Sequence, residues 1–136
     1  MVGNMNITED YVSFEVAKLL KEKGFDEESW CLYDLVSKKF AREIVTLDFR
    51  YNHNLPNYVA SAPTLQTAMK WLRKVHNIGI FPSTYCLLKD GEVTHPYGTC
   101  ITNLLTHEII VDDCLPVETY EDAIEKALIY CLTNLI

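Results

Sequence analysis

The chain has 136 residues, of which 49% are hydrophobic and 23% are charged, a composition typical of a single globular domain over residues 1–136. Its net charge of −7 at pH 7 disfavours binding to nucleic-acid phosphates and to anionic membranes. The five cysteines include no C-x-x-C pair, and neither a signal-peptide segment nor a membrane-spanning run is evident. We therefore expect reduced thiols and a cytoplasmic location.

The first predicted element is an amphipathic helix that begins near Tyr11 and ends at about Lys23. Either Ser13 or Thr8 is expected to cap its N-terminus, and Gly24 is expected to end it in the left-handed conformation. Its apolar face is predicted to consist of Val12, Val16, Leu19 and Leu20.

A β-hairpin is predicted next. Its strands are expected at Trp30–Val36 and Ile44–Tyr51, joined by the polar segment Ser37–Arg42. The second run alternates apolar with polar residues, which is typical of a strand with one buried face and one face in water. Residues Asn52–Ala62 are predicted to form a long loop.

The central helix is the clearest predicted element. We place Pro63 in its first turn and Asn77 at its C-terminal cap. Its apolar face is predicted to consist of Leu65, Ala68, Met69, Leu72 and Val75, with Trp71 beside it. Its polar face is predicted to consist of Gln66, Lys70, Arg73 and Lys74.

Several short strands are predicted between residues 78 and 114. The expected strands are Ile78–Phe81, Tyr85–Leu88, Glu92–Thr94, Thr99–Leu105 and His107–Val111. Pro82 implies a bulge, a break or a sheet edge, and Asp90-Gly91 is a strong turn signal.

The last predicted element is a helix that starts at Thr119, with Asp122 at capping-box spacing. Its buried face is predicted to consist of Ala123, Ile124, Ala127, Leu128, Cys131 and Leu135, widened by Ile129, Leu132 and Ile136. So broad an apolar face predicts packing against the sheet and also against another helix or a partner.

The predicted element order is α-β-β-α-β-β-(β)-α. The helices are too few to cross over between every pair of strands, which excludes an all-parallel sheet. We therefore predict an α+β fold: a single two-layer domain with a mostly antiparallel sheet of four to five strands and three helices.

Three segments carry a resemblance to a known family: residues 11–25, 62–77 and 120–136. Together they resemble an uncharacterised small protein family of gut Bacteroidales genomes and their phages or mobile elements. The resemblance implies a bacterial or phage cytoplasmic protein, and it implies no site residues.

Candidate chemistry in the sequence is sparse. Metal donors cluster at His95, His107, Asp112, Asp113 and Cys114, but hard and soft donors together do not select one metal, so we interpret them as polar residues at strand ends. A catalytic Cys–His pair requires the two side chains to be in contact. With five cysteines and four histidines in the chain, such a contact is expected by chance and carries little information. We therefore predict no catalytic, cofactor-binding or metal-ligating residue.

The central helix carries the main basic feature of the sequence. We predict a binding face on this helix that consists of Lys70, Arg73 and Lys74 together with Trp71. A basic face interleaved with an aromatic side chain suits a small anion, an acidic protein or a nucleic-acid backbone.

The function that we expect is that of a small non-enzymatic protein-binding or accessory module of a bacterium or its phage. The expected partner is protein, either a second copy of the chain or another chain, bound at an exposed sheet edge or at the apolar fringe of the C-terminal helix. The alternative is a nucleic-acid-binding accessory protein that uses the basic face of the central helix. An enzyme would require a pocket with converging polar groups and a perturbed titratable residue.

Overall fold

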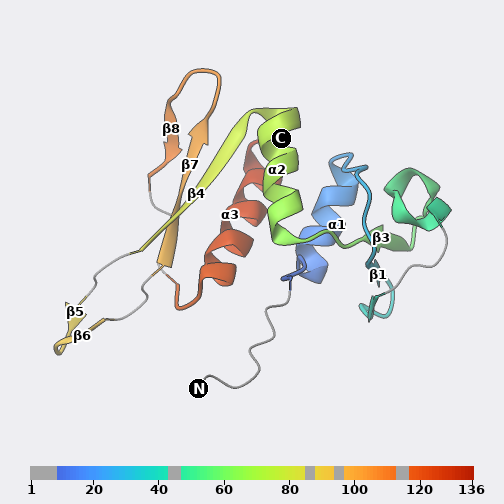
Figure 1. The fold of residues 1–136 in the computed structure, drawn as a ribbon, viewed down its shortest axis with the longest axis horizontal. Helices are drawn as coiled ribbons and strands as arrows, with labels where there is room; N and C mark the ends of the chain where they lie inside the picture. Colours follow the sequence, from blue (N-terminus) through green and yellow to red (C-terminus); the bar gives the residue numbers. More distant parts are fainter. Residues whose placement is uncertain (1–8, 43–46, 85–87, 94–96, 113–116) are drawn as a thin grey trace, which may run out of the picture.

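The computed structural model describes residues 9–42, 47–84, 88–93, 97–112 and 117–136. Among these residues, three α-helices lie side by side with an antiparallel sheet on either side of them (Figure 1). The helices are α1 (Phe14–Glu22), α2 (Leu65–His76) and α3 (Tyr120–Asn134).

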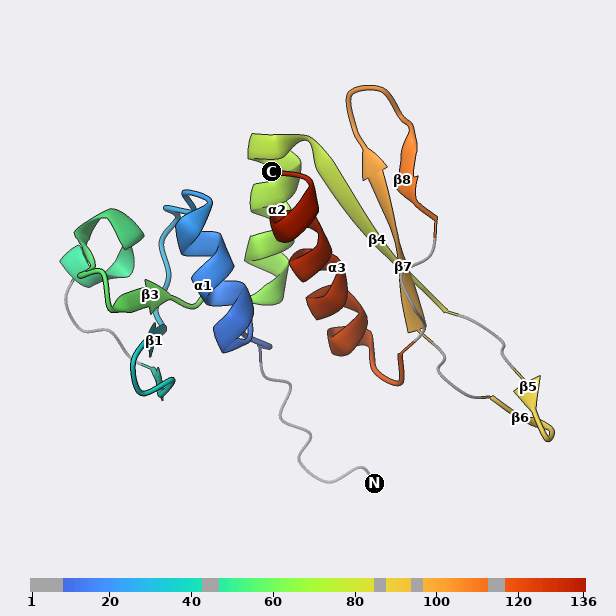
Figure 2. The ribbon, with the colours of Figure 1, turned by 180° about the vertical axis from the view of Figure 1, so that it is seen from behind.

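The described strands form two three-stranded sheets and one separate hairpin. The first sheet has the order β2–β1–β3, with β1 at Leu32–Asp34, β2 at Phe40–Ala41 and β3 at Val59–Ser61. The second sheet has the order β4–β7–β8, with β4 at Ile78–Thr84, β7 at Tyr97–Asn103 and β8 at Ile109–Val111. The hairpin of β5 (Leu88–Lys89) and β6 (Glu92–Val93) lies away from the rest (Figure 2).

The predicted α+β class with antiparallel strands is confirmed. The layers differ from the expectation of one sheet with helices packed against it, because the helices separate two smaller sheets. Helix α3 lies centrally and contacts α1, α2, β4 and β7, as its broad apolar face predicted. Six of its side chains are buried: Ala123, Ile124, Ala127, Leu128, Cys131 and Leu132.

The ends of the helices follow local sequence signals. The side chains of Ser13, Thr64 and Thr119 each accept a hydrogen bond from a backbone N–H in the first turn of the helix that follows. Gly24 and Asn77 have φ angles of 89° and 56° at the ends of α1 and α2. The predicted caps at Ser13, Asn77 and Thr119 are confirmed, whereas Thr8 lies outside the described residues.

Helix α2 differs from the prediction at two points. It begins at Leu65 with Thr64 as its cap, so Pro63 precedes the helix and does not lie in its first turn. Trp71 is buried with 5% of its surface exposed, whereas Val75 is 52% exposed. The reason is the position of Phe25, whose ring contacts Trp71 edge-on at a centroid distance of 5.4 Å and draws the core toward that side of the helix.

The first sheet uses strands other than those predicted. Strand β1 pairs with β2 inside the expected polar connection and with β3 inside the expected loop. The prediction of a strand at Ile44–Tyr51 is wrong for the described part of that range, because Leu47–Arg50 forms a 3₁₀ helix. Residues 44–46 lie outside the described residues. Phe49 is exposed, and the Arg50 guanidinium carbon lies 3.2 Å from the centroid of the Trp30 ring, which is opposite to the expected burial.

The second sheet follows the prediction more closely. Strand β4 continues through Pro82 and pairs with β7 from Ile78↔Asn103 to Thr84↔Tyr97. Because β4 pairs with β7 alone among the described strands, the edge interpretation of Pro82 is the correct one. The turn at Asp90-Gly91 is also confirmed, with φ angles of 54° and 80° at the two residues. Residues 85–87 of the expected strand Tyr85–Leu88 lie outside the described residues.

Three of the five cysteines lie in the described part of the chain. Cys31 and Cys100 form no disulfide, and Cys131 is buried in α3; Cys86 and Cys114 lie outside the described residues. No described helix has both the length and the apolar composition of a membrane span.

Candidate binding surfaces

A cleft lies between α2 and the segment that follows α1. Its volume is about 310 Å³, and it is lined by Glu27, Glu28, Thr67, Lys70, Trp71, Lys74 and Val75. We call it the α2 cleft. It falls at the lower end of the volume range of small-molecule sites in proteins.

The α2 cleft carries both signs of charge on different elements. Lys70 and Lys74 are exposed and one turn apart on α2, and Glu27 and Glu28 are exposed on the facing segment. Glu28 is paired with Arg50 at 3.2 Å. Among the described residues, no ion pair within 4.0 Å joins either lysine to either glutamate, so these charges face the cleft without neutralising one another by contact.

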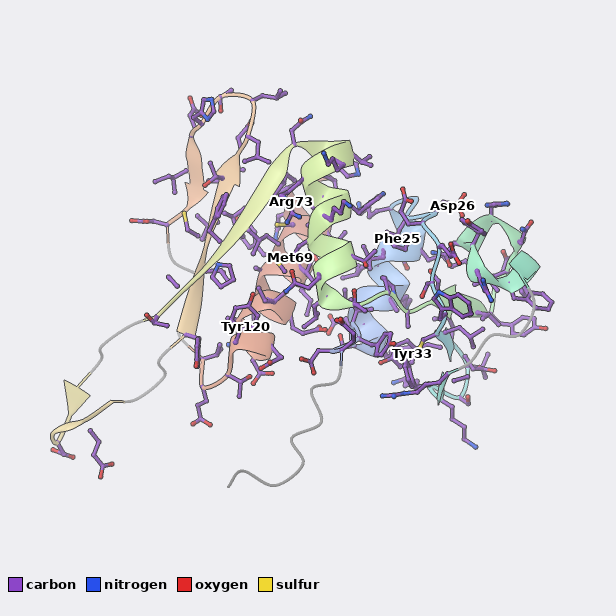
Figure 3. The ribbon with its side chains drawn as sticks, in the orientation of Figure 1. Phe25, Asp26, Tyr33, Met69, Arg73 and Tyr120 are labelled. Carbon is purple, nitrogen blue, oxygen red and sulfur yellow. The ribbon has the colours of Figure 1, made fainter. Side chains whose placement is uncertain are left out.

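The predicted binding face is only partly assembled. Lys70 and Lys74 line the α2 cleft, but Arg73, which is exposed on the same helix (Figure 3), does not. Trp71 forms part of the cleft wall but is buried against Phe25 and against His76, at a centroid distance of 4.7 Å. The expectation of Trp71 as an exposed stacking surface is therefore corrected. The two glutamates also reduce the positive potential that a nucleic-acid backbone requires.

A second cavity, of about 270 Å³, lies at the end of α1 and is lined by Lys21, Asp26 and His53 among others. The Asp26 carboxylate accepts hydrogen bonds from the backbone N–H of His53, at 2.9 Å, and from its Nδ1, at 2.7 Å. Burial lowers the pKa of Lys21, whose ammonium donates to the carbonyls of Pro56 and Val59. The lysine therefore ties α1 to the loop before β3 and to the first residue of β3, and the Asp26–His53 pair links the segment after α1 to His53.

A third surface is the side of the β4–β7–β8 sheet away from the helices. Since α2 and α3 contact only one side of this sheet (Figures 1 and 2), no described helix or strand covers the other. We call this side the outer face. It is formed by Gly79, Phe81 and Ser83 of β4, Gly98, Cys100 and Thr102 of β7, and Ile109 of β8.

The outer face exposes large apolar side chains. Phe81 is 50% exposed and Ile109 is 60% exposed. The Phe81 ring lies over Gly79, because a Cβ atom at position 79 would be only 2.7 Å from Phe81 Cε2 and 2.9 Å from Leu104 Cδ2. Sequence reasoning missed this surface, although the alternation Ile78-Gly79-Ile80-Phe81 contained the signal that Phe81 points away from the two isoleucines.

The open edge of β4 is a poor template for another strand. Leu104 N donates to Asn77 O, whereas Asn103 N donates to Glu108 O on the opposite side of β7. In an antiparallel pair, successive residues point their backbone N–H and C=O groups to opposite sides of the strand. On β4, the backbone groups that point toward the open edge are therefore those of Ile78, Ile80, Pro82 and Thr84. Pro82 offers no N–H there, and proline at such a position limits edge-to-edge pairing. Strand addition to β4 therefore has less support than the outer face.

The apolar fringe of α3 is largely occupied within the chain. Leu132 is fully buried, and Ile129, Leu135 and Ile136 pack against the core. Helix α3 is also fixed to α1, because the Glu125 carboxylate accepts hydrogen bonds from the backbone N–H and the hydroxyl of Ser13, at 2.8 and 2.7 Å. Burial raises the pKa of Glu125 in spite of these two donors.

The predicted metal donors are only partly described. His107 has a φ angle of 63° in the turn between β7 and β8, and His95, Asp113 and Cys114 lie outside the described residues. Within the described ranges, no group of three or more His, Cys, Asp or Glu residues is placed to hold a metal ion.

Comparison of the chain with protein-family models, with curated proteins and with solved structures yields no match.

Proposed function

We propose that the chain is a small non-enzymatic accessory protein of a bacterium or its phage, acting in the cytoplasm, and that it binds protein through the outer face. The observation that carries the proposal is the exposure of Phe81 and Ile109, with Phe81 and Leu104 meeting over Gly79, on a side of the sheet that no described helix covers. Contiguous exposed apolar surface of this kind marks interaction sites in soluble proteins.

The partner that we propose is a second copy of this chain. The described residues of β4 and β7 on the outer face carry no charge, so two chains of net charge −7 meet least repulsion there. The face is bulky at Phe81 and shallow at the Ser83↔Gly98 pair. A two-fold interface brings one patch against itself, so the projecting ring of one copy is placed over the shallow end of the other.

The test is the oligomeric state of the full chain and of two variants, measured by light scattering and sedimentation from about 1 to 100 µM. The chain with Phe81→Asp and Ile109→Asp is expected to be monomeric, because burying a carboxylate in an apolar interface is costly. Val36→Asp is the matched control, since Val36 is exposed in the turn between β1 and β2, and this variant is expected to dimerise like the unmodified chain.

Two outcomes contradict the proposal. An unmodified chain that remains monomeric over the whole concentration range rules out self-association as its function. A dimer that survives both aspartates places the interface elsewhere on the molecule. Circular dichroism of each variant verifies that the fold is retained.

A further inference from the structure

The α2 cleft has a chemical character that the proposed function does not use. One wall is cationic and comes from Lys70 and Lys74, and the facing segment supplies Glu27 and Glu28. The same cleft is lined by the side chain of Val75, which is 52% exposed, and by the buried ring of Trp71. A site with two opposite charged walls and an apolar part complements a molecule with the same three features.

The charged groups at the cleft are available to a ligand. Among the described residues, Lys70, Lys74 and Glu27 take part in no ion pair or side-chain hydrogen bond. Glu28 is engaged by Arg50, whose guanidinium is held against the Trp30 ring. Glu27 is therefore the carboxylate left to contact a cation, and the two lysines are the groups left to contact an anion.

The Trp71 ring that lines the cleft is held by its neighbours. It packs edge-on against Phe25 and His76. The backbone of Phe25 is fixed in turn by hydrogen bonds from its N–H to Leu20 O and from Asn52 Nδ2 to its carbonyl, at 2.9 and 2.8 Å. A site that is formed before the ligand arrives avoids the cost of ordering it.

The size of the cleft limits the ligand. Its volume of about 310 Å³ equals the space of about ten water molecules at 30 Å³ each. This space suits a molecule of about ten non-hydrogen atoms, and it excludes a nucleotide or a folded partner from lying inside it.

From these observations we infer that the α2 cleft binds a small zwitterion with an apolar side chain, the class that includes free α-amino acids. The carboxylate of the ligand contacts Lys70 and Lys74, its ammonium contacts Glu27, and its side chain lies over Val75. The inference is independent of the outer face, which involves none of these residues.

Three probes of matched shape test the assignment by calorimetry or by NMR titration. They are phenylalanine, 3-phenylpropanoate, which lacks the ammonium, and phenethylamine, which lacks the carboxylate. Exposed ion pairs contribute modestly, so phenylalanine is expected to bind weakly, and each of the other two probes is expected to bind about three to ten times more weakly still.

Variants of the full chain assign each contact to a residue. In the variant that combines Lys70→Gln and Lys74→Gln, phenylalanine is expected to bind no better than phenethylamine binds to the unmodified chain. With Glu27→Gln, phenylalanine is expected to bind no better than 3-phenylpropanoate. Lys126→Gln and Glu121→Gln lie on α3 outside the cleft and are the matched controls, with affinities expected to stay unchanged.

Each contrary result overturns the inference in a distinct way. If 3-phenylpropanoate binds as tightly as phenylalanine, the cleft is an anion site in which Glu27 takes no part. If none of the three probes binds at about 10 mM, or if the control variants weaken binding as much as the cleft variants, the cleft is not a zwitterion site. None of these results bears on the oligomeric state.

Discussion

The two sides of the β4–β7–β8 sheet both carry large apolar side chains and have opposite surroundings. On the inner side, Ile80 is 5% exposed and Ile101 is fully buried under the helices. On the outer side, Phe81 and Ile109 are at least half exposed. The difference shows that hydrophobic composition decides which residues can form a core, whereas the placement of α2 and α3 decides which of them do.

The largest expected effect tests this contrast directly. Ile101→Ala is expected to lower the free energy of unfolding by about 2–5 kcal/mol, because it leaves a cavity among packed side chains. Ile109→Ala is expected to change it by no more than about 0.5 kcal/mol. Urea denaturation of both variants, at a concentration below that at which the chain dimerises, measures the two values, and comparable losses would show that Ile109 is packed within the monomer.

The next prediction concerns Glu125, a partly buried carboxylate between α3 and α1. Because burial raises the folded-state pKa of Glu125 above its ordinary value of 4.5, the folded chain binds this proton more tightly than the unfolded chain does. The stability that this group contributes is therefore fully present below pH 4.5 and is lost as the pH rises through the folded-state pKa.

Glu125→Gln removes that dependence while keeping an acceptor for Ser13. The melting temperature of the variant minus that of the unmodified chain is expected to rise by a few degrees between about pH 4 and pH 7. Glu121→Gln, at an exposed position on the same helix, is expected to show no such trend. A constant difference across this range would mean that Glu125 titrates normally.

A smaller effect is expected at Gly79 on the outer face. Gly79→Ala places a methyl group where Phe81 and Leu104 now make contact, so the Phe81 ring must move outward. Both neighbours are ends of side chains, so the free energy of unfolding is expected to change by about 1 kcal/mol or less. The dimer of the proposed function is expected to dissociate more readily, and sedimentation measures this change. Unchanged self-association would show that the Phe81 ring is not part of the interface.

The smallest effect on folding is expected at the edge of β4. Pro82→Thr restores a backbone N–H on the open edge and is expected to change stability by less than about 1 kcal/mol. Its effect is on association: larger oligomers are expected to form in light scattering, because the edge becomes a template for another strand. An unchanged size distribution would show that Pro82 does not limit pairing.

The local features of the fold were predictable from the sequence because they depend on neighbours within a few residues. The caps at Ser13 and Thr119 bond the first turn of their own helices, and the Asp90-Gly91 turn follows from the φ angles that these residues tolerate. The alternation around residues 47–50 misled the prediction, because Arg50 packs on Trp30 and Asn52 bonds to Phe25 and Ser61, which are distant in sequence.

The candidate sites were less predictable than the elements. Helical spacing correctly placed Lys70 and Lys74 on one exposed face, but it did not place Glu27 opposite them, since that contact joins two segments about 40 residues apart in a shared cleft. Trp71 was assigned to the binding face because helical periodicity does not show that Phe25 covers its ring.

The sequence by itself determined the α+β class, the three helices with most of their caps, and a net charge that leaves little support for nucleic-acid binding. These follow from periodicity, from short-range hydrogen bonds and from composition. Only the tertiary structure decided how the strands divide into two sheets, which side of the second sheet faces water and which charges meet across the α2 cleft. Those features depend on contacts between segments far apart in the chain, and no local pattern specifies such contacts.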